Sequence, residues 1–145
     1  MLPSMSSGAR IPPHNLEAEQ SLLGALLIDQ EAMLKVGDTV RPEDFYRDSY
    51  RIVFETMVEI FGRHQPIDIL TLGNRLEERN VLKQIGGRTA LVELTNVVTT
   101  SAHVSHYAEI ISKKAALRRL LRAAGEITEL GFDENSELEI ILDRA

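Results

Sequence analysis

Residues 10–24 read RIPPHNLEAEQSLLG, and this stretch determines where the first helix of the protein begins. Pro12 and Pro13 disfavour a helix through themselves and in the residue before them. Asn15 can accept a hydrogen bond from a free amide of the first turn. The acidic residues after it are favoured near the positive end of the helix dipole. Apolar side chains then recur with helical spacing from Leu16 onward. The stretch therefore predicts a helix that starts at about residue 16.

The chain up to about residue 100 continues as short helical segments separated by turn residues. The clearest periodicity lies in residues 50–61, where apolar side chains follow the i, i+3, i+4 pattern of one helix face. Pro42 is typical of the first position of a helical turn, and Asp68 is typical of a helix cap. The pattern predicts an all-α protein whose residues 10–100 form a compact, multi-helix head.

Residues 101–145 predict a long helical hairpin. No proline interrupts the chain from His103 to Leu130, which predicts one helix of about 28 residues, far above the usual length of about 11–12. Ser136 and Glu139 form a capping-box pattern for a second helix. The chain ends inside that helix at Ala145, so we expect the second helix to be truncated and the natural protein to continue. Residues 1–9 are small and polar and predict a disordered tail or a cloning remnant.

Apolar side chains on both hairpin helices are the predicted working surface. A long helix that leaves a small head cannot bury a broad apolar stripe against that head alone, and the short second helix covers only part of it. Exposed apolar surface of this kind marks a contact with another chain. The candidate residues for self-association and partner binding are Tyr107, Ile110, Ile111, Leu117, Leu120, Leu121, Ala124, Ile127, Leu138, Ile141 and Leu142.

Composition excludes several classes of function. The net charge of −6, the 5% aromatic content and the absence of tryptophan disfavour a protein whose main task is to bind nucleic acid. The absence of cysteine removes disulfides and thiolate zinc sites. No apolar run approaches the ~20 residues that span a bilayer. The sequence GxxxxGK followed by Ser or Thr is absent, so we expect no ATP site, no cofactor and no catalytic residue.

Two other hypotheses remain open at this stage. Five basic residues cluster on the long helix, and Lys114, Arg118 and Arg122 lie along one ridge of it. This basic ridge favours either a solvated face that pairs with acids of a neighbouring chain or a phosphate contact in a small DNA-binding or regulatory domain. The five basic residues are Lys113, Lys114, Arg118, Arg119 and Arg122. His103, His106 and Glu109 suggest a metal-dependent enzyme, although such a site needs a further ligand; the simpler interpretation is a histidine pair that faces solvent or a dimer seam.

The opening run resembles the start of bacterial replicative DNA helicases of the DnaB family. Further matches follow in order: PEDFY at residues 42–46, IGG at 85–87, YAxII at 107–111 and LRRL at 117–120. The similarity covers residues 10–145. The order and spacing of these matches identify the chain as similar to the N-terminal domain of such a helicase.

The resemblance implies a place in a larger machine. The full-length family member is a hexameric, ATP-driven helicase of bacterial cytoplasm, whose separate C-terminal motor domain holds the ATP and Mg²⁺ sites. Its N-terminal domain is a helical head followed by a hairpin. Hairpins pair into dimers, and three dimers form a collar that docks the C-terminal domain of primase and, in some species, a helicase loader. By position, residues 107–127 and 138–142 would supply these surfaces, with at most a weak or indirect contact to DNA and none to a membrane.

Overall fold

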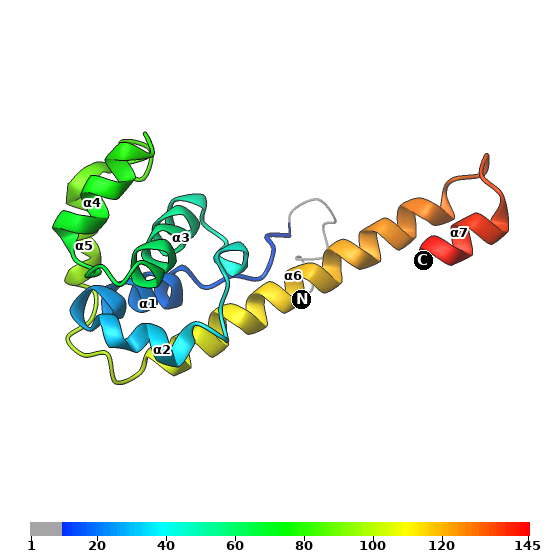
Figure 1. Ribbon diagram of the computed structural model, residues 1–145. Coiled ribbons are helices and arrows are strands. Elements are labelled where there is room, and N and C mark those ends of the chain that lie inside the picture. The colour runs from blue at the N-terminus through cyan, green and yellow to red at the C-terminus, as the bar shows by residue number, and fades with distance from the viewer. Residues whose placement is uncertain (1–9) are drawn as a thin grey trace. The chain divides into compact units, whose positions relative to one another are not determined.

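A computed structural model describes residues 10–145, and within them every regular element is a helix (Figure 1). The predicted all-α class is confirmed, whereas the expectation for residues 1–9 lies outside the described residues. The described chain divides into two units, residues 14–115 and residues 10–13 together with 116–145. The elements are α1 (Leu16–Ile28), η3 (Gln30–Ala32), α2 (Met33–Val36), η4 (Pro42–Asp44), α3 (Asp48–Gly62), α4 (Ile69–Glu78), α5 (Gly87–Thr95), α6 (Val104–Gly131) and α7 (Leu138–Arg144).

The start of α1 is capped as its sequence predicts. The side-chain oxygen of Asn15 accepts a hydrogen bond from the Ala18 amide at 2.9 Å. Glu19, by contrast, is not a solvent-exposed acidic residue that interacts with the helix dipole, because its side chain is buried. Its carboxylate accepts hydrogen bonds from the amides of Tyr46 at 2.8 Å and Arg47 at 3.3 Å. A buried charge needs such partners, and here they fix the turn that precedes α3.

Helices α1 and α5 pack closely within the unit of residues 14–115. Leu22, Leu23 and Leu26 of α1 are fully buried in the core, together with Leu91 of α5. Gly24 permits this approach, because a Cβ at this position would collide with the backbone carbonyl oxygen of Leu94. The missing side chain therefore determines how near the two helix axes can come.

Helices α3 and α4 are joined by ion pairs at the edge of the same core. Arg75 donates two hydrogen bonds to the Glu59 carboxylate, at 3.0 and 2.8 Å. Arg79 donates to Glu55 at 2.7 Å and to the Thr56 hydroxyl at 2.5 Å. Bidentate arginine–carboxylate pairs fix orientation as well as adding binding energy. The pairs therefore hold α4 in register on the outer side of α3.

The long helix α6 has the predicted length and contains 28 residues. Its first part belongs to the unit of residues 14–115, where Val104, Ala108, Ile111 and Ala115 are buried. These positions follow an i, i+4, i+7, i+11 pattern, so one stripe of the helix completes the core. From residue 116 onward the helix belongs to the other unit and contains no buried residue.

Candidate interaction surface

The second part of α6, together with α7, displays a row of large apolar side chains to solvent. Leu120 is 65% exposed and Leu121 is 55% exposed, and on α7 Leu138 and Leu142 reach 68% and 64%. Leu117, Ala124 and Ile127 are also exposed, and Ile141 is half-buried. Leu117, Leu121 and Ala124 are spaced i, i+4, i+7, so they lie on one face of the helix. The eight predicted surface residues from Leu117 onward therefore lie in residues 116–145.

The other three predicted residues belong to the unit of residues 14–115. Tyr107 and Ile110 are half-buried and pack against its core. Ile111 is only 1% exposed, and its inclusion in the surface was wrong. The physical reason is that the apolar residues of this part of α6 are divided between two faces. The stripe through Val104 and Ala108 makes the core contact and includes Ile111, whereas Tyr107 and Ile110 lie at its margin.

Within residues 116–145, two exposed large apolar side chains were not among the predicted surface residues. Phe132 follows the end of α6 and is 78% exposed, and Ile140 on α7 is 50% exposed. Periodicity could not find Phe132 because it lies in the turn between the helices. The available signal was the polar sequence after it: Asp133, Glu134 and Asn135 follow Phe132 directly, which indicates that this aromatic residue lies in an exposed turn.

The turn between α6 and α7 is organised by Asp133. Its carboxylate accepts hydrogen bonds from the Ser136 hydroxyl at 2.6 Å and from the Asn135 amide at 3.2 Å. The bond from Ser136 lowers the pKa of Asp133, as do the backbone amides of the turn. The predicted capping box of Ser136 and Glu139 is wrong, since Glu137 is the N-cap of α7 and makes no side-chain cap bond. Ser136 closes the turn instead.

Comparison with known proteins identifies the family of this chain. The model of the DnaB-like helicase N terminal domain family matches residues 11–113. The chain belongs to this family.

The relatives of this DnaB-like domain are replicative helicases. It is 39% identical to the replicative DNA helicase DnaB of Geobacillus stearothermophilus and 35% identical to the replicative DNA helicase DnaC of Bacillus subtilis. Each match covers 94% of this chain and 30% of the relative, so the chain spans less than a third of their length. The crystal structure of the N-terminal domain of DnaB helicase from Mycobacterium tuberculosis superposes with a TM-score of 0.89 at 36% identity, covering 92% of this chain and 94% of that one.

The basic ridge of the DnaB-like domain is partly engaged by its own chain. Arg118 donates a hydrogen bond to the carbonyl oxygen of Pro13 at 2.8 Å, within the unit of residues 10–13 and 116–145. A guanidinium that holds a backbone carbonyl has fewer donors left for a phosphate. This contact lowers the support for the DNA-binding hypothesis and gives the proline segment of the opening run a packing role.

The metal hypothesis of the sequence analysis finds no support in the described DnaB-like domain. Among residues 10–145, no three His, Cys, Asp or Glu side chains gather closely enough to bind an ion. The ring of His106 lies beside that of Tyr107, with centroids 6.3 Å apart. Within the same residues, no helix combines the length and apolar character that a bilayer crossing demands.

Proposed function

We propose that this domain is a non-catalytic assembly and docking module of a hexameric replicative helicase. The observation that carries the proposal is the row of exposed leucines on residues 116–145. Burial of one such side chain contributes about 1.5–3 kcal/mol, so a surface with several of them favours association strongly. The domain would pair with a second copy through this surface, and three such pairs would form the hexamer. We expect the domain alone to hydrolyse no ATP.

The first partner is a second copy of the chain. The i, i+4, i+7 spacing of Leu117, Leu121 and Ala124 suits side-by-side helix packing, in which apolar side chains of one helix fit between those of another. An aspartate placed in such a seam would be buried without a partner, which is costly. We therefore expect Leu121→Asp to weaken the dimer at least tenfold.

Sedimentation velocity over a wide concentration range tests this pairing. Leu70→Asp is the matched control, because Leu70 is 67% exposed on α4 in the other unit and the same charge is introduced there. The unaltered domain and the control should associate alike, whereas Leu121→Asp should remain monomeric to higher concentration. A domain that is monomeric at every concentration would contradict the proposal.

The second partner is the C-terminal domain of primase, with a helicase loader as its counterpart in some species. Support comes from the family membership and from the apolar surface on α7, where Leu138 and Leu142 are well exposed. Titration calorimetry with purified primase C-terminal domain should show a loss of affinity for Leu142→Asp and none for Leu70→Asp. Equal affinities for both variants would show that α7 is not part of the surface that binds primase.

A further inference from the structure

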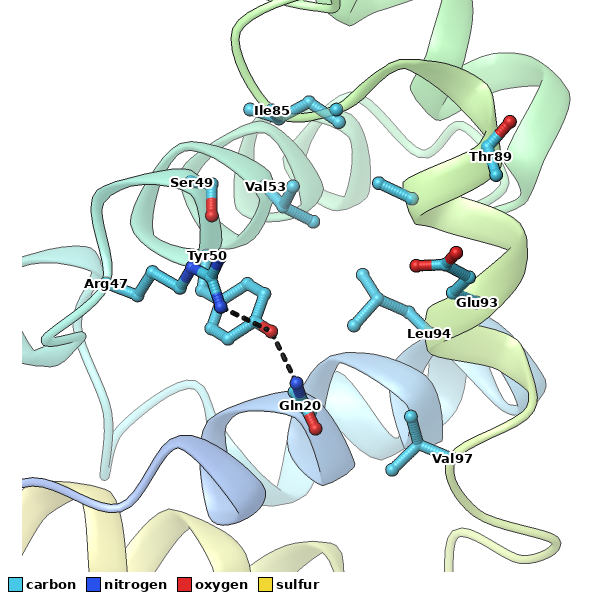
Figure 2. Close-up of a pocket in the computed structure, with 12 residues that line it drawn as sticks. Gln20, Arg47, Ser49, Tyr50, Val53, Ile85, Thr89, Glu93, Leu94 and Val97 are labelled. Atoms are coloured by element: carbon cyan, nitrogen blue, oxygen red, sulfur yellow. Dashed lines mark hydrogen bonds between the residues drawn. The ribbon is translucent and has the colours of Figure 1, made fainter.

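A cavity of about 370 Å³ lies in the other unit, between α1, α3 and α5. Figure 2 shows Gln20, Arg47 and Tyr50 on one side of it and Thr89 and Glu93 on the other. Its volume is within the range of roughly 300–1,000 Å³ that is usual for ligand pockets. The cavity is built wholly from residues 14–115, so it is separate from the surface proposed above for self-association.

Part of the cavity wall is apolar. Val53, Ile85 and Leu94 line it and are themselves almost fully buried in the core, and Ala90 lines it with a small side chain. A side chain that entered would therefore contact hydrocarbon that the core already holds in place. Removal of its apolar surface from water would favour binding, as it does in folding.

The α3 side of the cavity presents hydrogen-bond donors. The hydroxyl oxygen of Tyr50 accepts bonds from the side-chain amide of Gln20 at 2.6 Å and from the Arg47 guanidinium at 3.5 Å. A phenolic oxygen has two acceptor positions and one proton, so its O–H is left to donate to an incoming acceptor. The guanidinium carbon of Arg47 lies 5.1 Å from the centre of the Tyr50 ring, which holds the charge beside that hydroxyl.

The Tyr50 hydroxyl and the backbone of Arg47 are held in place before any ligand binds. The backbone amide of Arg47 is fixed by the buried carboxylate of Glu19, and Gln20 is the next residue on the same turn of α1. Preorganised donors lose little entropy on binding, which favours affinity. Arg47 and Tyr50 together match a carboxylate, which accepts several hydrogen bonds and carries the opposite charge.

The α5 side has a different character. Glu93 lines the cavity there, and among the described residues its carboxylate makes no ion pair. A second acidic group near Glu93 would be repelled, so a ligand carboxylate is directed to the Arg47 side. Ser49 on α3 and Thr89 on α5 also line the cavity, and their hydroxyls can bond to the polar backbone of a bound peptide.

We propose that this cavity receives an apolar side chain of a partner-protein segment and that Arg47 and Tyr50 bind the carboxylate of the adjoining acidic residue. The partner is defined by this chemistry: a large apolar residue directly beside an aspartate or glutamate. The inference goes beyond the assembly role proposed above and does not depend on it.

The test uses short blocked peptides and NMR spectra of the ¹⁵N-labelled domain. The first probe is acetyl-Gly-Phe-Asp-Gly-amide, and its twins replace aspartate by asparagine or phenylalanine by alanine. A peptide this small should bind with a dissociation constant on the order of 1 mM. We expect its addition to shift the amide signals of Val53, Ala90 and Leu94, with the asparagine twin about fivefold weaker because it lacks the charge. The alanine twin should cause no shift.

Three variants locate the effect. Ala90→Leu fills the cavity and should abolish the shifts, provided that its spectrum shows a folded domain. Arg47→Gln should bind the aspartate and asparagine peptides alike. Arg51→Gln is the matched control, since Arg51 lies one turn further along α3, outside the cavity lining, and should behave as the unaltered domain.

Several outcomes would overturn the inference. Equal shifts from the aspartate and asparagine peptides in the unaltered domain would exclude recognition of a carboxylate. Unchanged binding by Ala90→Leu would exclude the cavity as the binding site. If 3-phenylpropanoate bound while the blocked peptides did not, the site would serve a small carboxylate instead. If Arg47→Gln lowered self-association in sedimentation, the occupant would be a second copy of this chain. Failure of the hairpin variants would leave the peptide-binding readouts unaffected.

Discussion

Two parts of one helix, residues 104–115 and 116–131 of α6, show how the same kind of sequence serves two purposes. The first part buries Val104, Ala108, Ile111 and Ala115, side chains that are mostly small, and the second leaves Leu120 and Leu121 in water. The leucines of the second part are therefore outside the core of residues 14–115. Since apolar burial drives folding, leucines that remain exposed are available to drive association instead.

The sharpest test of this contrast is to truncate one buried leucine of residues 14–115 and one exposed leucine of residues 116–145 in the same way. Leu22 is fully buried on α1, so Leu22→Ala should lower the free energy of unfolding by about 3–4 kcal/mol through lost burial and the cavity it leaves. Leu120→Ala removes the same atoms from an exposed position and should change stability by no more than about 0.5 kcal/mol. Urea unfolding of dilute protein measures both. Similar losses for the two variants would mean that residues 116–145 have a core of their own.

The sequence predicted the local features of both parts and missed those that depend on distant partners. The cap at Asn15 and the length of α6 follow from neighbouring residues, namely a capping side chain beside two prolines and an absence of proline. Glu19 could not be interpreted in the same way, because its partners at Tyr46 and Arg47 are 27 and 28 residues away. Ile111 was misplaced because an apolar pattern shows that a helix is amphipathic without showing which neighbour covers each face. The capping role predicted for Ser136 was wrong because its hydroxyl donates to Asp133 instead.

The cavity illustrates the same limit. Gln20 belongs to the opening run, and Ile85 and Gly86 belong to the IGG match at residues 85–87. Arg47 and Tyr50 come from the segment between them. Each was interpretable only as a helix or turn residue in its own stretch. Their convergence depends on the packing of α1 against α3 and α5, which the sequence does not specify residue by residue.

Two glycines extend the comparison to backbone packing. Gly24→Ala should destabilise the domain by about 2–3 kcal/mol, because the new methyl group meets the Leu94 carbonyl oxygen and the α1–α5 contact must open. Gly125→Ala on α6 meets nothing within 4 Å and should stabilise that helix by about 0.5–1 kcal/mol. Thermal unfolding of both variants gives the signs. A stabilising Gly24→Ala would show that the two helices are further apart than described.

A smaller effect than that of Gly24→Ala is expected for the ion pairs that join α3 and α4. The hydrogen bonds from Arg75 lower the pKa of Glu59 below its ordinary value of 4.5. The unfolded chain therefore binds a proton at Glu59 more readily than the folded chain does. The stabilisation is fully present above about pH 4.5 and is lost as the pH falls through the lower, folded pKa. Glu59→Gln should accordingly lower the free energy of unfolding by only about 1 kcal/mol at pH 7, because the pair is partly open to solvent. The loss should become smaller in acid, where Glu59 is protonated in the unaltered domain as well.

A double-mutant cycle assigns this acid limb to the pair. Glu59→Gln and Arg75→Gln should each flatten the decline in stability between neutral pH and about pH 3, and the double variant should lose little more than either alone. Arg63 lies 3.0 Å from the same carboxylate and is more exposed, so Arg63→Gln should keep most of the wild-type slope. An unaltered slope in Glu59→Gln would place the acid-sensitive group elsewhere. The hairpin turn around Asp133, whose pKa is lowered by Ser136, would then be the next place to look.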